Sequence, residues 1–198
     1  MSLSPDALKL IKNYFFGDKK EFNKLTKVAQ EIIETFLFDK NSSTLREELT
    51  LSVAGCKKID KKQGADGYDS TRKKYVEVKP EYAHKNEKGK QKKLTGGGSF
   101  NDITLKKIND IKDWDILCSG FADDKCLFVV RFPANHITSD LEAKLLKKIN
   151  NSTTRKSVRF GYKQYIDCPN LEILYFDENN SKKCMSKVML QKFINLTK

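Results

Sequence analysis

Apolar residues recur every three or four positions in several parts of the chain, as they do on the buried face of a helix. In EFNKLTKVAQEIIETFLF, residues 21–38, they form one continuous stripe, which predicts a helix packed on the core. Residues 41–55 predict a second helix that ends at a glycine. The same spacing predicts three further helices, over residues 101–114, 138–150 and 183–196.

Polar and apolar residues alternate strictly in KYVEVK, residues 74–79, which predicts a strand. Its two valines then point to one face, whereas Tyr75, Glu77 and Lys79 point to the other. A carboxylate and an ammonium therefore share one face. Pro80 is expected to end regular pairing on its side of this strand. Further strands are predicted over residues 115–121, 125–132 and 171–176.

The order of these elements, helices and strands mixed along the chain, predicts a mixed α/β fold. No composition shift or linker divides the sequence, so we expect a single domain over residues 1–198. The segment HKNEKGKQKKLTGGGS, residues 84–99, has no periodicity and is expected to be a loop. It is either a solvated insertion or a loop that an anionic partner orders.

The chain is strongly basic, with 38 Lys and Arg against 26 Asp and Glu and a formal charge of +12. This surplus favours a polyanionic partner, nucleic acid or an acidic membrane, although a merely basic soluble protein would share it. No signal peptide or spanning segment of about 20 apolar residues is evident, so no membrane association is expected. Five scattered cysteines without a CxxC pair favour a reducing, cytoplasmic compartment and argue against zinc.

The glycine turn GADGYDS, directly before the KYVEVK strand, carries the residues of greatest chemical interest. If the two segments form a hairpin, Asp66 comes alongside Glu77, because neighbouring strands lie about 5 Å apart. Two such carboxylates favour Mg²⁺, with the carbonyl of Val78 as a further ligand. Lys79 would then lie beside a phosphate and orient or help deprotonate water. Asp69 is an alternative to Asp66 as the first metal ligand. The alternative to the whole site is that Glu77 and Lys79 form an ordinary surface ion pair on the strand, without a metal site.

An aspartate in a turn, about ten residues, and then E-x-K on the next strand resemble the PD-(D/E)xK nuclease superfamily. The resemblance covers roughly residues 45–132. It implies a restriction-endonuclease-like core, a mixed β-sheet flanked by helices, that cleaves phosphodiester bonds with Mg²⁺. It also implies that Asp66 and Glu77 are metal ligands and that Lys79 is the catalytic lysine.

Two details of the resemblance concern the residues around this motif. Many superfamily members contribute an acid from the helix before the core sheet, and here that position falls on Glu48 or Glu47. Ala65 precedes Asp66, where the superfamily pattern has proline. The resemblance therefore rests mainly on the spacing of the acids and the lysine.

Basic, aromatic and hydroxyl residues alternate in NSTTRKSVRFGYKQY, which suits phosphate contacts combined with arginine readout of guanine. This places DNA recognition in the C-terminal part, residues 133–198, unless the segment is a charged loop followed by a core strand. The expected DNA contacts are Arg155, Lys156, Arg159, Tyr162 and Lys163, together with Lys90, Lys92 and Lys93 of the lysine-rich loop.

The small size, with little room beyond a catalytic core, resembles a stand-alone type II restriction endonuclease, bacterial or virus-encoded. A palindromic site on double-stranded DNA would imply a twofold homodimer, since each active site cuts one strand. A repair or structure-specific nuclease would use the same three side chains without sequence specificity. A non-catalytic nucleic-acid-binding module would bind DNA and leave it intact.

Overall fold

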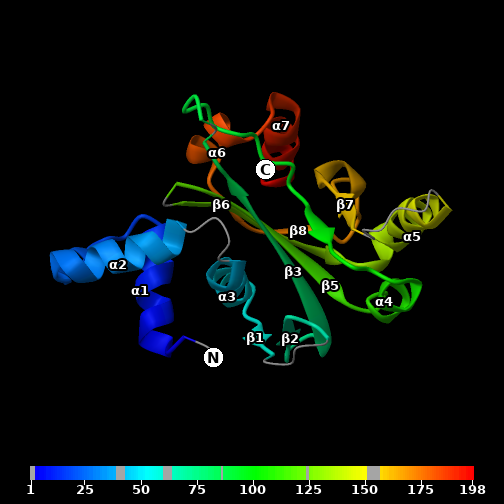
Figure 1. Ribbon diagram of the computed structural model, residues 1–198, viewed down its shortest axis with the longest axis horizontal. Helices are drawn as coiled ribbons and strands as arrows, with labels where there is room; N and C mark the ends of the chain where they lie inside the picture. The colour runs from blue at the N-terminus through cyan, green and yellow to red at the C-terminus, as the bar shows by residue number, and fades with distance from the viewer. Residues whose placement is uncertain (1–2, 39–42, 60–63, 86, 124, 151–156) are drawn as a thin grey trace.

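A six-stranded sheet forms the centre of the protein in a computed structural model, shown in Figure 1. The structure describes residues 3–38, 43–59, 64–85, 87–123, 125–150 and 157–198. The strands are β1 (Lys57–Lys58), β2 (Gly67–Asp69), β3 (Lys74–Ala83), β5 (Asp115–Ala122), β6 (Lys125–Pro133) and β8 (Glu172–Phe176), in that order across the sheet. A separate pair is made by β4 (Gly98–Phe100) and β7 (Val158–Phe160).

The sheet is mixed, as the sequence resemblance implies. β3 and β5 run parallel, and every other neighbouring pair is antiparallel. A parallel pair needs a crossover connection, and residues 84–114 supply it through β4 and the short helix α4 (Leu105–Asp110). This crossover passes over the face of β3 that carries Glu77 and Lys79, so the connection itself helps to build the candidate site.

One face of the sheet is covered by helices from the N-terminal part: α1 (Pro5–Phe15) and α3 (Ser43–Val53), with α2 (Lys27–Phe38) further out (Figure 1). Leu51 of α3 packs on Val76, Val78 and Leu117, all of which are almost fully buried. The two valines of the KYVEVK strand thus anchor β3 to α3, as the alternation predicts. Glu77 and Lys79 are left on the opposite face.

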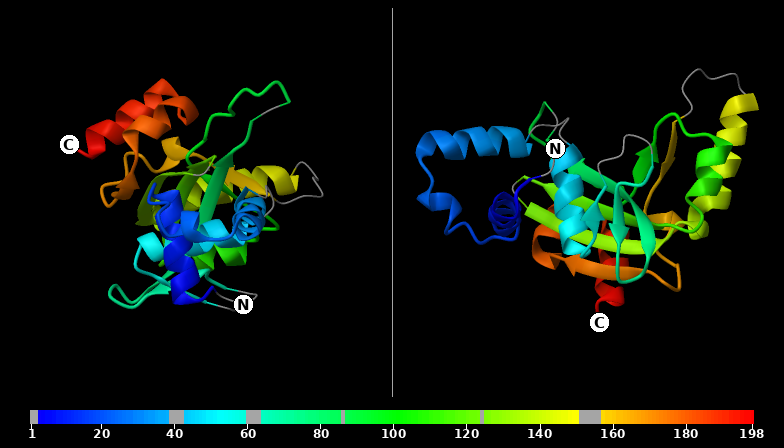
Figure 2. Two further views of the ribbon diagram at one scale, coloured as in Figure 1. Left: turned by 90° about the vertical axis from the view of Figure 1, so that its left-hand side faces the viewer. Right: turned by 90° about the horizontal axis from the view of Figure 1, so that it is seen from below.

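The opposite face is covered by α4, by α5 (Asn135–Asn150), by the β4–β7 pair, and by α6 (Glu178–Cys184) and α7 (Lys187–Leu196) (Figures 1 and 2). This is the larger core. Phe132 and Tyr165 stack with ring centroids 4.4 Å apart, and Phe128 packs edge-on against Phe193 of α7. The segment after residue 157 is therefore part of the same packed structure as the sheet.

Several elements differ from their prediction. α1 was not expected, although Ser4 caps it and Pro5 opens it, a recognisable helix start. Of the helix predicted over residues 101–114, only α4 is formed. It begins after its cap at Thr104, and the residues before Thr104 connect it to β4. α2 begins at Lys27, after the short 3-10 turn η1 (Phe22–Lys24), and Val28 on its first turn is 66% exposed.

Pro80 does not end β3, which continues to Ala83 alongside β5. Val76 accepts a backbone hydrogen bond from Asp66, so the backbone groups of Val76 and, by alternation, of Pro80 point away from β5. The N–H group that proline lacks is therefore not needed for pairing with β5. On the other side, pairing with β2 reaches only as far as Val76.

The lysine-rich crossover is not a free loop along its whole length. Leu94, Gly96 and Gly97 are buried, and residues 98–100 pair with β7. The carboxylate of Glu81, on β3, accepts hydrogen bonds from the backbone N–H groups of Thr95 and Gly96. Glu81 thus fixes the glycine-rich segment against the sheet. Within the described ranges, no helix has the length and apolar character needed to cross a membrane.

Candidate active site

β2 and β3 form the predicted hairpin, and Asp66 lies directly before β2. Gly67 pairs with Val76 and Asp69 with Lys74, so the ladder ends one residue after Asp66. The backbone N–H of Asp66 donates to the carbonyl of Val76 at 3.0 Å, which ties Asp66 to β3. The carboxylate of Asp66 is close enough to Glu77 for the two negative charges to interact.

The carboxylate of Asp66 is held at the point where β2 has ended. Its Oδ2 accepts a 2.7 Å hydrogen bond from the backbone N–H of Val78. Burial, and next the negative charge of Glu77, raise the pKa of Asp66 to about 6, against the hydrogen bond from Val78 and the charge of Lys79. Such a carboxyl gains most from a cation that neutralises it together with its neighbour.

Glu77 is 7% exposed and is shared by two lysines. The ammonium of Lys79 lies 2.6 Å from its Oε1, and that of Lys107, from α4, lies 3.4 Å from its Oε2. Lys107 also donates to the carbonyl of Gly64 at 3.2 Å and lies 4.5 Å from the centroid of the Trp114 ring. The site thus contains a second lysine that the sequence motif did not include.

The crossover segment fixes the position of Lys79. Its ammonium lies 4.5 Å from the centroid of Phe100, and its side chain is only 15% exposed. A Cβ atom at Gly98 would lie 2.6 Å from the Cβ atom of Lys79, so only a glycine lets the backbone pass this close. The catalytic lysine that the sequence predicts is therefore enclosed between β3 and β4.

Asp69, the alternative first ligand, lies on the opposite face of the sheet. Its Oδ2 is 2.8 Å from the guanidinium of Arg131, and its Oδ1 accepts from the backbone N–H groups of Thr71 and Arg72. Burial opposes ionisation of Asp69, but these hydrogen bonds outweigh it, so its pKa is lowered. Asp69 acts as a structural partner of Arg131, and Asp66 is the aspartate beside Glu77.

The two helix glutamates occupy different environments. Glu48 is buried: its Oε1 lies 2.6 Å from the ammonium of Lys58, and its Oε2 accepts from the backbone N–H of Leu3. Glu47 is partly exposed, and its charge is among those that raise the pKa of Asp66. Glu47, more than Glu48, is therefore positioned to act on the Asp66–Glu77 pair.

No family model matches the chain, and no curated protein matches it. The sequence resemblance and the arrangement of side chains therefore carry the functional argument.

The donors of the site are hard oxygens: the carboxylates of Asp66 and Glu77, and the carbonyl of Val78 at the same edge of β3. Such a set suits Mg²⁺, which keeps several waters and takes few protein ligands. No cluster of three or more His, Cys, Asp and Glu side chains suited to a metal occurs among the described residues. The remaining ligands of a divalent ion would have to be water and substrate oxygens.

Only some side chains of the predicted recognition segment lie on the surface. Arg159 and Lys163 are exposed, whereas Tyr162 is half-buried and packs on the main core. Arg155 and Lys156 lie outside the described residues. Arg159 pairs with Ser99 of β4, the strand that passes over Lys79, so its position is one strand away from the candidate active site.

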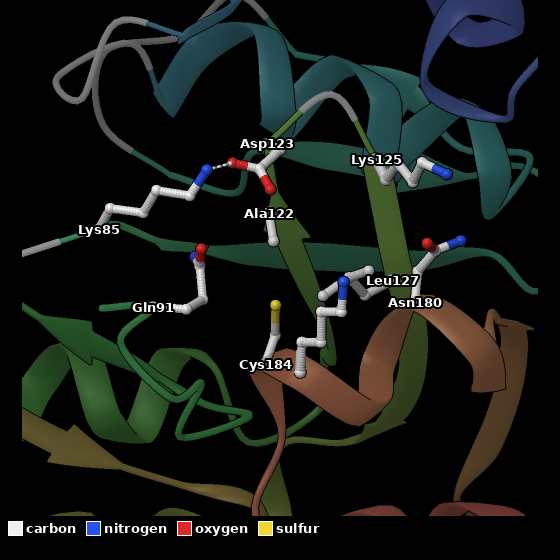
Figure 3. A pocket seen from close by; sticks show the side chains of 9 residues that line it. Lys85, Gln91, Ala122, Asp123, Lys125, Leu127, Asn180 and Cys184 are labelled. Atoms are coloured by element: carbon white, nitrogen blue, oxygen red, sulfur yellow. Dashed lines mark ion pairs between the residues drawn. The ribbon is translucent and has the colours of Figure 1, made fainter. Parts of the chain in front are cut away.

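The lysine-rich loop reaches the far end of β3, roughly 20 Å from Glu77 at about 3.3 Å per residue. A pocket of about 280 Å³ opens there; Figure 3 shows its lining, with Lys85 directed at Asp123 in a 3.2 Å ion pair. Lys125 and Lys183 also line it. Lys90, Lys92 and Lys93 are exposed, and the ammonium of Lys93 donates to the carbonyl of Lys183. This pocket is separate from the carboxylate site and has a basic lining.

Proposed function

We propose that the protein is a Mg²⁺-dependent endonuclease that hydrolyses phosphodiester bonds of double-stranded DNA. The observation that carries the proposal is the proximity of Asp66 to Glu77, with the ammonium of Lys79 2.6 Å from Glu77. These are the residues on which the resemblance to the PD-(D/E)xK superfamily rests. A mixed sheet flanked by helices is compatible with the core that this resemblance implies.

In this proposal, Asp66, Glu77 and the carbonyl of Val78 hold the divalent ion, and Glu47 assists from α3. When bound, the ion supplies Lewis-acid polarisation of the phosphate and acidifies water. Lys79 orients the attacking water and offsets the negative charge that builds on the phosphate. The water oxygen loses one proton to bulk solvent and forms the new bond to phosphorus, the bond to the leaving sugar oxygen breaks, and that oxygen takes up a proton from solvent.

The basic surface supports DNA as the substrate. A charge of +12 favours a polyanion, and exposed Arg159 lies one strand from the proposed catalytic lysine. We assign sequence recognition to Arg159 and Lys163 and backbone contacts to Lys90, Lys92 and Lys93. A type II restriction enzyme acting as a homodimer on a palindromic site is the form of activity that this size and charge favour.

Incubation with supercoiled plasmids of known sequence, in Mg²⁺ and in EDTA, tests the proposal. Discrete linear fragments in Mg²⁺ alone are expected. Smears or nicks would indicate a nuclease without sequence specificity, which keeps the chemistry and removes the restriction activity. DNA that is bound but left intact by the folded protein in Mg²⁺ would show a binding module and contradict the proposal.

A further inference from the structure

Lys107 lies in a position built from three separate parts of the chain. Its ammonium contacts the carbonyl oxygen of Gly64, before β2, and the Oε2 of Glu77, on β3. It also lies over the ring of Trp114, which precedes β5. Its side chain is 30% exposed, so this lysine is partly withdrawn from solvent. These contacts show a defined cation position beside the catalytic residues.

The two oxygens around Lys107 are of the type that a divalent ion uses. A backbone carbonyl and a carboxylate oxygen are hard ligands, as Mg²⁺ and Mn²⁺ prefer. The other oxygen of Glu77 already has Lys79 at 2.6 Å. Each oxygen of this one carboxylate therefore has its own ammonium partner, and a second ion could use Glu77 Oε2 and Gly64 only if Lys107 left.

The charges of the site also favour one divalent ion over two. Asp66 brings one negative charge, Glu77 and Glu47 bring two more that both act on it, and Lys79 and Lys107 bring two positive charges. One divalent ion leaves these groups with a net charge of +1, which a single phosphodiester balances. A second ion would leave +3, with no anionic group of the substrate to offset it.

We propose that Lys107 takes the place of a second divalent ion, so that each chain binds one metal ion at this site. This inference rests on the proposed nuclease function and specifies its metal requirement. Lys107 is then a positioning residue: its ammonium holds Glu77 and the turn at Gly64 in place while the single ion occupies the side of Asp66.

The test counts bound Mn²⁺ per chain, from the loss of the free-ion signal in electron paramagnetic resonance. It compares the wild-type chain with Lys107→Met, which keeps an apolar stem on Trp114 but removes the ammonium. Lys106→Met is the matched control, since this exposed neighbour loses the same charge outside the site. Lys107→Gln serves as a second variant, and circular dichroism melts confirm that each variant is folded.

The expected result is one Mn²⁺ for the wild type and for Lys106→Met, and two for the folded Lys107 variants. Two ions in the wild type, or one in both folded Lys107 variants, would overturn the inference. Glu77→Gln separates this from failure of the proposed function. If Glu77→Gln binds as much Mn²⁺ as the wild type, the metal is not held by this site and the nuclease proposal itself loses its basis.

Discussion

Replacing Asp66 with asparagine should stabilise the protein at neutral pH while abolishing its proposed cleavage. Asparagine keeps the size of the side chain and an oxygen that can accept from the N–H of Val78, which the carboxylate does at 2.7 Å. It removes a negative charge that is partly buried and lies close to Glu77. Stability and function are therefore opposed at this residue, as is common in active sites.

The magnitude follows from the pKa of Asp66, which is about 6 in the folded protein against its usual value of 3.8. A pKa raised by folding means that ionisation costs stability. The cost is absent below pH 3.8, grows between about pH 4 and pH 6, and is complete above that range. This difference between the two pKa values corresponds to about 3 kcal/mol in the free energy of unfolding. For a chain of this size, that is about 6 to 12 °C in Tm.

Thermal unfolding of the wild type and Asp66→Asn at pH 8 and at pH 4 measures this effect. A higher Tm of the variant at pH 8, shrinking towards pH 4, is expected. Asp69→Asn is the matched control on the same hairpin, and it should lose about 3 kcal/mol or more, because it leaves the buried Arg131 without its closest carboxylate. A lower Tm of Asp66→Asn at pH 8 would refute the reasoning that its carboxylate is confined beside Glu77.

Three other substitutions test different parts of the account. Lys79→Met should lower the cleavage rate by about 100- to 10,000-fold. It should also lower Tm, because it leaves the buried carboxylate of Glu77 without its closer ammonium. Gly98→Ala should push the side chain of Lys79 aside, because the added Cβ atom would lie too close to it. We expect it to cost about 1 to 3 kcal/mol of stability and to lower the cleavage rate at least about tenfold. Ser99→Ala, the control, should leave both nearly unchanged. Lys92→Ala, which removes a proposed phosphate contact, should weaken DNA binding and reduce its log–log salt slope by about 0.9, measured by fluorescence anisotropy, and Lys9→Ala on α1 should not.

The central hairpin was accessible to sequence reasoning because its pattern is local. Alternation in KYVEVK assigned Val76 and Glu77 to opposite faces of the strand, and the structure confirms this: Val76 packs on Leu51 of α3, and Glu77 contacts Lys107 of α4. The choice between Asp66 and Asp69 was not local. It depended on Arg131, three strands along the sheet, whose guanidinium pairs with Asp69. An arginine inside the apolar run KCLFVVRF was the available sign that an acid would be buried beside it.

Lys107 could not be found from the sequence because its role depends on where α4 is placed. The helix has only six residues, and its position follows from the β4–β7 pair and from the cap at Thr104. Strands of three residues carry too little alternation to be recognised. In contrast, the start of α1, Ser4 followed by Pro5, was a readable signal that was missed.

Cleavage of plasmid DNA by the wild type and by Glu77→Gln, purified in parallel and assayed in Mg²⁺ at pH 8, tests the central claim most directly. Glu77 contacts both lysines, and its charge acts on Asp66, so it links the lysines of the proposed site to its second carboxylate. We predict cleavage by the wild type that EDTA stops, and none detectable by the variant, although both bind DNA equally well. Equal cleavage by the folded variant would contradict the account.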